Sequence, residues 1–297
     1  INAADSITQI SATLTENQCD SLLKALKGSD PQKRAVIQAH TRLGLKSGTS
    51  FIQTLIHDEN PLISGAARAF CARVEGDLDQ LKPLIPQLYD LQAGRRRSAV
   101  IDLGDSGDIS MLQYLIKSAV SMPLRAKSAF QLVDPTKKAE VPEEHIKTIT
   151  TLLQDDPRSL AMRDEWLSQQ DPIEIENNLQ HRDEGKQYGA AQSLLKMPKA
   201  KQIEIIDGIH SRLWSDYGAN YLLTSLIGLA SIHEREELIK TSLAETLPQY
   251  AKSRVAAAWG CLKLDLTDQL DLLKEISTSS QWVPLRWSCL HVLNNFS

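Results

Sequence analysis

The stretch that decides the fold runs from His181 to Leu195 and reads HRDEGKQYGAAQSLL. Its first five residues form a charged connector, and the pattern behind them predicts a helix that starts near Gln187. One side of that helix is apolar or aromatic, at Tyr188, Ala191, Leu194 and Leu195. Gly189, Ala190 and Ala191 carry little side chain, so a second helix can approach closely, as stacked helical pairs require.

The same plan of a polar connector, an aromatic residue and a small-rich helix recurs downstream. It reads SDYGANYLLTSLIGLA from Ser215, PQYAKSRVAAAWGCLKL from Pro248 and SQWVPLRWSCLHVL from Ser280. Aligning the second helix of each hairpin gives spacings of 28 to 35 residues, at Arg34, Ser64, Arg97, Arg125, Leu160, Tyr188, Tyr221, Arg254 and Arg286. A recurrence near 30 residues is typical of an α-solenoid whose repeat is one helical hairpin.

Helix starts are marked by an acceptor side chain followed by proline, an arrangement suited to an N-cap and the first helical position. It occurs at Asp30-Pro31, Asn60-Pro61, Asp156-Pro157 and Asp171-Pro172. No stretch alternates with a period of two, which predicts an almost wholly α-helical protein. We expect one solenoid domain over residues 1–297, with a flexion or irregular repeat near 134–171, where Lys137, Lys138 and Glu140 before Pro142 read as an exposed linker.

Composition narrows the classes of partner. The net charge of −4 and the pI near 6.0 provide no broad cationic field, so neither nucleic acid nor an anionic membrane is expected as main partner. No run of about 18 apolar residues and no signal peptide is evident, so we expect a soluble, cytoplasmic protein. The four cysteines lack metal-ligand spacing and are expected to be small buried thiols: Cys19, Cys71, Cys261 and Cys289.

The hairpin length and three segments carry a resemblance to a known family. They are RRRSAVIDLGDSGD at 95–108, LRAKSAFQLVD at 124–134 and the stretch at 181–195. With them the chain resembles the HEAT-like repeats of the E/F-type phycobilin lyases, which attach linear tetrapyrroles to cysteines of the phycobiliproteins in cyanobacterial and red-algal phycobilisomes. The resemblance implies an all-α solenoid of HEAT-like hairpins with bilin lyase activity. Overall likeness favours the phycoerythrin-directed branch.

The resemblance also implies the partners of the chain. Free bilin is expected as substrate rather than as a prosthetic group, and a phycobiliprotein subunit as acceptor. Length favours a single-chain member over a heterodimer subunit, while a homodimer or a partner lyase subunit is left open. Members that also isomerise the bilin can carry a His-Cys pair. This sequence lacks that pair, so isomerase activity is unsupported.

A bilin lyase must hold the acceptor thiolate and the ethylidene carbon of the bilin in register while a proton is delivered. Arginines suit the two propionates, a carboxylate facing the pyrrole N–H groups raises the electrophilicity of the bilin, and aromatic rings stack on its flat face. Two neighbouring connector-helix junctions contain these groups. They are His181, Arg182, Asp183 and Tyr188, then Arg212, Trp214, Asp216, Tyr217 and Tyr221.

We assign these residues as follows. Asp183 or Asp216 is predicted to be the catalytic carboxylate on the pyrrole nitrogens. The predicted bilin-binding residues are Arg182 and Arg212 on the propionates and Tyr188, Trp214 and Tyr217 as stacking walls, with His181 and Tyr221 beside them. No metal ligand is expected. For each residue a structural interpretation stands beside this one, because Asp at such a position caps helices and Tyr packs between hairpins.

Other features remain ambiguous. Arg125, Arg254 and Arg286 recur at the register of the repeat, so hydrogen bonds between hairpins explain them as well as a site does. Trp282 and Trp287 are expected to close the last hairpin. The alternative function is a non-catalytic HEAT-like scaffold or chaperone that grips a phycobiliprotein, or assists phycobilisome assembly, through its concave face.

Overall fold

Helices are the regular secondary structure in the part of the chain that the structure describes. The computed structural model describes residues 16–133, 141–167 and 171–296, and no strand occurs within them. The fold class predicted from the repeat spacing is confirmed: the protein is an all-α solenoid of stacked helical hairpins. The linker predicted at Lys137, Lys138 and Glu140 lies outside the described residues.

Two compact units divide the chain. Unit 1 comprises residues 1–120 and 127–141, and unit 2 comprises residues 121–126 and 142–297. The chain therefore passes between the units within residues 120–142, which overlap the beginning of the segment 134–171 where the sequence predicts a flexion.

In unit 1, α3, α5 and α6 pack side by side around a core of Val36, Ile37, Ile63, Phe70 and Leu103. The helices are α2 (Glu16–Ala25), α3 (Asp30–Leu43), α4 (Thr49–Thr54), α5 (Pro61–Phe70), α6 (Ala93–Ser106), α7 (Leu112–Leu115) and α8 (Met122–Leu132), whose first turn belongs to unit 2. A π-helical turn at 71–75 extends α5. A seven-residue 3-10 helix at 78–84 and shorter ones at 55–57, 86–89 and 109–111 connect the rest.

Buried ion pairs tie α3 to α6. Arg34 donates through Nη2 to Asp102 Oδ1 at 2.7 Å and through Nη1 to Oδ2 at 3.1 Å, and Arg42 Nε donates to Asp105 Oδ1 at 2.8 Å. Burial raises the pKa of the Asp102 carboxyl to about 6, and the Arg34 guanidinium acts in the opposite direction. At this repeat position the arginine is structural, because its guanidinium joins two helices through a carboxylate that is nearly inaccessible to water.

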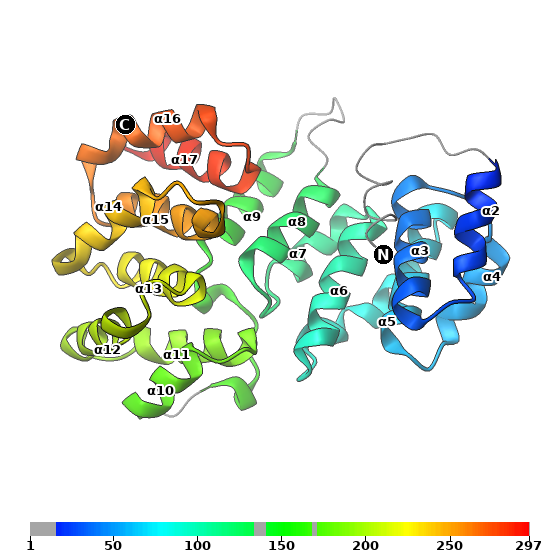
Figure 1. The fold of residues 1–297 in the computed structure, drawn as a ribbon, viewed down its shortest axis with the longest axis horizontal. Helices are drawn as coiled ribbons and strands as arrows, with labels where there is room; N and C mark the ends of the chain where they lie inside the picture. The colour runs from blue at the N-terminus through cyan, green and yellow to red at the C-terminus, as the bar shows by residue number, and fades with distance from the viewer. Residues whose placement is uncertain (1–15, 134–140, 168–170, 297) are drawn as a thin grey trace. The chain divides into compact units, whose positions relative to one another are not determined.

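Unit 2 contains the more regular stack. Four hairpins pair α10 with α11, α12 with α13, α14 with α15 and α16 with α17, and their second helices lie side by side (Figure 1). The helices are α9 (Glu143–Gln154), α10 (Pro172–Leu179), α11 (Glu184–Leu195), α12 (Lys199–Leu213), α13 (Tyr217–Leu229), α14 (Glu236–Ala244), α15 (Ala251–Lys263), α16 (Leu270–Ser279) and α17 (Val283–Asn295). Short 3-10 turns occupy 157–159, 164–166, 233–235, 248–250 and 267–269.

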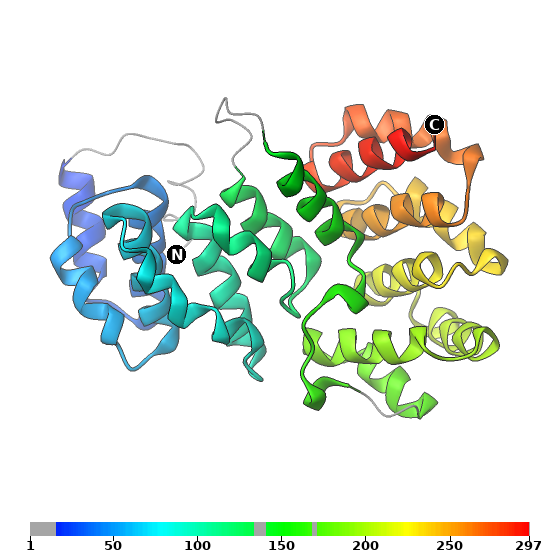
Figure 2. The same ribbon diagram turned by 180° about the vertical axis from the view of Figure 1, so that it is seen from behind.

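Helix α9 departs from the nearest-neighbour order of a solenoid. It packs against α15 and α17, which come much later in the chain (Figure 2). The indole Nε1 of Trp287 donates to Thr150 Oγ1 at 3.4 Å, and Ile149, Leu152 and Leu153 of α9 are buried. A repeat unit normally contacts only its neighbours in sequence. The start of unit 2 is thus fastened to its end.

Three local predictions need correction. Helix α3 is capped by Ser29 rather than Asp30, because Ser29 is extended and its N–H donates to the Gln32 side chain at 3.0 Å. Helix α11 begins at Glu184 rather than near Gln187, because Asp183 already caps it. Leu160, aligned with the second helices, is not helical: the turn started by Pro157 ends at once, since Leu160 itself is extended (φ −84°, ψ 146°). The predicted caps Asn60, Asp156 and Asp171 are confirmed.

Small residues permit close packing, in two different ways. Between α13 and α15, a Cβ added to Gly228 would lie 2.9 Å from the Cα of Gly260, so these two helices approach closely, as the small-residue pattern predicts. On α11, a Cβ added to Gly189 would overlap the backbone carbonyl of Trp166. At Gly189 the element that comes closest to α11 is therefore the 3-10 turn at 164–166 rather than another helix.

Replacing Gly189 by alanine is expected to destabilise unit 2 by about 3 kcal/mol, the upper end of the range for overpacking, because backbone rather than a flexible side chain must move. Gly208→Ala in α12 is the matched control. Nothing lies within 4 Å of its added Cβ, so the better helix propensity should stabilise by about 0.5 to 1 kcal/mol. Urea denaturation of both variants measures the pair, and equal effects would contradict the close approach.

Candidate functional site

The two predicted acids cap helices in unit 2. Asp183 Oδ1 accepts from the N–H of Gly185 at 2.8 Å at the start of α11. Asp216 Oδ1 accepts from the N–H groups of Gly218 and Ala219 at 2.9 and 2.8 Å at the start of α13. Both side chains lie at the positive end of a helix dipole.

The other predicted residues of the two junctions have separate neighbours. His181 Nδ1 accepts from the N–H of Asp183 at 2.9 Å, and Arg182 is exposed. In the second junction, Arg212 pairs with Glu176, the Trp214 ring lies 4.8 Å from that of His210, and Tyr217 meets Tyr250 edge to face at 5.5 Å.

Tyr188 and Tyr221 are brought together by a residue that was not predicted. Asp155, just after α9, accepts from the Tyr188 hydroxyl at 3.0 Å to each carboxylate oxygen, and also from Tyr221 and from Arg125 of α8. We call these four side chains the buried polar cluster. All are at most 9% exposed. Burial, reinforced by the Asp155 charge, raises the pKa of both tyrosines well above the usual range, so their hydroxyls remain donors.

The cluster depends on an unusual backbone. Asp155 has φ 48°, in the left-handed region that aspartate tolerates better than most residues. This conformation ends α9 and brings the carboxylate to the tyrosines of α11 and α13. Sequence offered one signal, the arginine at the aligned repeat position 125, but nothing in it identified Asp155 as the partner.

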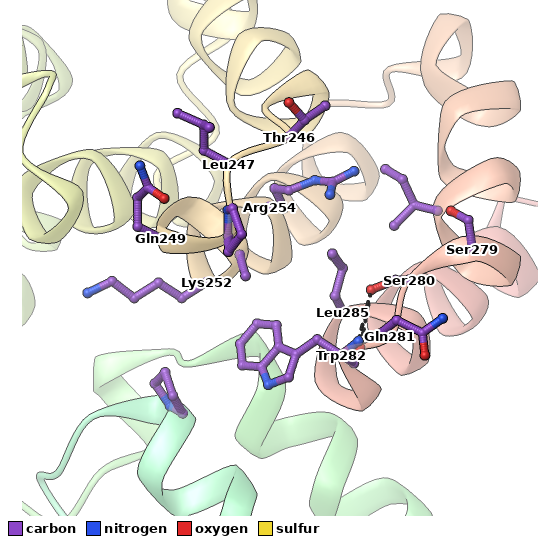
Figure 3. A pocket seen from close by; sticks show the side chains of 14 residues that line it. Thr246, Leu247, Gln249, Lys252, Arg254, Ser279, Ser280, Gln281, Trp282 and Leu285 are labelled. Carbon is purple, nitrogen blue, oxygen red and sulfur yellow. Dashed lines mark hydrogen bonds between the residues drawn. The ribbon is translucent and has the colours of Figure 1, made fainter.

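A large cavity lies elsewhere in unit 2, between the start of α15 and the α16–α17 connection. It has a volume of about 710 Å³. Figure 3 shows Lys252 and Arg254 of α15 and Trp282, just before α17, around one opening. Its lining comes from residues 246–254 and 276–285, with Pro123 from α8. None of the nine predicted site residues lines it.

Lys252 links this cavity to the buried polar cluster. Its Nζ lies 4.9 Å from the centre of the Tyr221 ring. Burial lowers the pKa of the Lys252 ammonium, and the charges of Asp216, Asp155 and Glu184 oppose that effect. Lys252, Arg254 and Trp282 belong to the segments from Pro248 and Ser280, which repeat the plan of residues 181–195. That repetition is the sequence signal that could have identified them.

A smaller cavity of about 220 Å³ adjoins one predicted acid. Asp216 lines it together with Gln180 and Gln187, and the remaining walls are mainly apolar, from Leu179, Ile209, Leu213, Leu222 and Leu223. The smaller cavity thus has an acid in its lining, and the larger one has none.

The three described thiols contribute no nucleophile, and the side chain of Cys19 lies outside what the structure describes. Cys71, Cys261 and Cys289 are free and buried, and burial raises the pKa of each to about 12, so they are protonated at neutral pH. Within residues 16–133, 141–167 and 171–296, no group of three His, Cys, Asp or Glu side chains could hold a metal ion. In the same ranges, no helix combines the length and the apolarity that a membrane crossing requires.

Comparison with known proteins finds distant relatives of this all-α solenoid. No family model matches the chain. It is 23% identical to the "Uncharacterized phycocyanin operon protein Y" of Pseudanabaena tenuis, over 93% of this chain and 66% of that protein. It is 21% identical to the "Bilin biosynthesis protein CpeY" of Synechococcus, over 94% of this chain and 68% of that protein. The chain thus spans about two thirds of the length of these relatives.

Among solved structures, human deoxyhypusine hydroxylase aligns with 97% of this chain and 98% of its own, at 15% identity and a TM-score of 0.38.

Proposed function

We propose that the chain is a phycobilin lyase that attaches a linear tetrapyrrole to a cysteine of a phycobiliprotein through a thioether bond. Phycoerythrobilin is the first bilin to test. The observation that carries the proposal is the similarity, along more than nine tenths of the chain, to a protein named for bilin biosynthesis. A cavity with cationic and aromatic lining in unit 2 supports it.

In this reaction the chain positions the bilin and the acceptor and assists proton transfer. It need not supply a nucleophile. The acceptor's sulfur bonds to the ethylidene carbon, the C=C bond opens into the conjugated system, and the tetrapyrrole takes up one proton, so no oxidant or reductant is required. The acceptor supplies the thiolate, in keeping with the buried, protonated state of Cys71, Cys261 and Cys289. The chain holds bilin and acceptor in register.

In this proposal the predicted junction residues keep their assigned roles. Asp183 or Asp216 stabilises the cationic bilin, Arg182 and Arg212 attract the propionates, and the exposed ring of Tyr217 stacks on the tetrapyrrole. The hydroxyls of Tyr188 and Tyr221 are already committed to the buried polar cluster. Bilin is a substrate here, and no resident prosthetic group is proposed.

A second candidate function is a chaperone or scaffold for phycobiliproteins that performs no chemistry. One specific observation favours it: both predicted acids cap helices, and two of the three predicted tyrosines, Tyr188 and Tyr221, belong to an internal cluster, so these residues have structural roles already. Such a protein would bind the apo subunit through exposed surface, with no need for a pigment site.

One co-production experiment separates the two functions. The chain is made in a bacterium that also produces phycoerythrobilin and a candidate phycobiliprotein subunit, with the chain omitted as control. The lyase proposal predicts bilin colour on the subunit that survives denaturing electrophoresis only when the chain is present. More soluble subunit without covalent colour would establish the chaperone instead.

A further inference from the structure

The charge of the large cavity is opposite to that of the chain. Fourteen residues line it, and the charged ones are Lys252 and Arg254, both cationic. The chain as a whole has 37 acidic against 33 basic residues, so a lining with two cations and no acid does not reflect average composition. A concave site with charge of one sign is complementary to a ligand of the other sign.

These two cations also lack the carboxylate partners that many other cations of the protein have. Arg34, Arg42 and Arg235, for example, each pair with an aspartate. Within the described ranges Lys252 forms no ion pair, and its ammonium lies over the Tyr221 ring. Arg254 donates through Nε to the Leu243 carbonyl at 3.1 Å. The Nη atoms of Arg254 have no hydrogen-bond partner among the described residues. The Arg254 guanidinium can therefore still donate two hydrogen bonds to the carboxylate of a ligand.

An aromatic wall and the size complete the site. Trp282 is partly buried, and its indole lies beside the opening in Figure 3. A volume of about 710 Å³ falls within the range of roughly 300 to 1,000 Å³ typical of small-molecule sites. The first turns of α15 and α17 contribute to the lining, so the positive ends of two helix dipoles lie nearby.

We infer that this cavity holds the propionate side of the bilin: Lys252 and Arg254, in place of Arg182 and Arg212, bind its propionates, and Trp282 stacks on one of its pyrrole rings. This assignment rests on the proposed function, since a bilin is the flat, doubly negative ligand which that function requires. It moves the propionates to the starts of α15 and α17, and it leaves the carboxylate role with the predicted acids, of which Asp216 caps the neighbouring helix α13.

The test uses biliverdin and its dimethyl ester as probes, titrated into the purified full chain and followed by absorbance. The wild type is expected to bind the free acid at least about tenfold more tightly than the ester, because charged hydrogen bonds to the propionates are lost. In the Lys252→Met, Arg254→Met double variant that preference should vanish. Trp282→Ala should weaken both probes alike, and Trp282→Phe should restore most of the binding.

Matched controls keep the charge change and move it out of the cavity. Arg286, exposed on α17 at the repeat position corresponding to Arg254, and Lys274, exposed on α16, are replaced together by methionine and should leave both affinities unchanged. Lys252→Met alone retains the Arg254 bond to Leu243, so it tests the site even where the double variant unfolds.

The outcomes separate the assignment from the function. Biliverdin binding with an acid-over-ester preference that survives in the cavity variants would overturn the assignment and leave the lyase proposal intact. If the wild type binds neither probe while the co-production experiment still yields covalent colour, the assignment alone fails. Absence of both binding and colour would remove the two together.

Discussion

The double variant Asp183→Asn, Asp216→Asn is expected to lose bilin attachment by about 100-fold or more while the fold stays intact. Asparagine caps helices about as well as aspartate, and its Oδ1 can keep the hydrogen bonds to the N–H groups of Gly185 and Gly218. Only the negative charge is removed. If a carboxylate stabilises the cationic bilin or transfers its proton, that loss acts directly on the reaction.

The measurement is covalent colour on the acceptor subunit per unit time, with circular dichroism to verify helical content. Asp171→Asn is the matched control, because Asp171 caps α10 through the same contact, with the N–H of Ile173 at 3.0 Å, and lies outside the predicted site. Wild-type attachment by the double variant would show that neither acid takes part in the reaction.

Replacing Asp155 by alanine is expected to destabilise unit 2 by more than about 5 kcal/mol. Asp155 is one partner of a buried ion pair with Arg125, and removing one partner of such a pair costs about 3 to 5 kcal/mol. The hydroxyls of Tyr188 and Tyr221 lose their acceptor as well, at about 1 to 3 kcal/mol each. Alanine is also unfavourable at φ 48°.

Two further variants divide this loss into its parts. Asp155→Asn tolerates the left-handed backbone and keeps one acceptor oxygen, so it should be more stable than Asp155→Ala and less stable than wild type. Tyr188→Phe removes one hydrogen bond to a charged group and should cost about 1.5 to 3 kcal/mol. Urea denaturation measures the three variants, and Asp155→Ala should be the least stable of them. An Asp155→Ala protein within about 1 kcal/mol of wild type would contradict the role of the cluster.

Repetition made the solenoid predictable, because each hairpin repeats one plan and aromatic or small residues mark its second helix. The exceptions are contacts that no repeat encodes. The irregular segment around Leu160 and the partner of Gly189 depend on the left-handed residue Asp155 and on the turn at 164–166. Local spacing contains no information about either.

The sequence predicted the type of segment that could form a site, but not which of these segments line the large cavity. Sequence pointed to connector-helix junctions rich in acids, bases and aromatic residues, and the large cavity does lie at such junctions. It could not rank them, because Lys252 and Arg254 differ from many other cations of the described ranges in forming no ion pair, and that depends on the three-dimensional surroundings. The same limit applies to Asp183 and Asp216, whose capping contacts follow from spacing while a role in chemistry does not.

The packing of α9 on α15 and α17 has a consequence for biogenesis. Thr150 is translated 137 residues before its partner Trp287, an interval on the order of 10 s at typical ribosomal rates. Throughout that interval the apolar side of α9 lacks the helices that it packs against in the folded protein. Unit 2 therefore cannot complete its folding hairpin by hairpin during synthesis. We expect the nascent chain to depend on holding chaperones more than a solenoid with sequential contacts does.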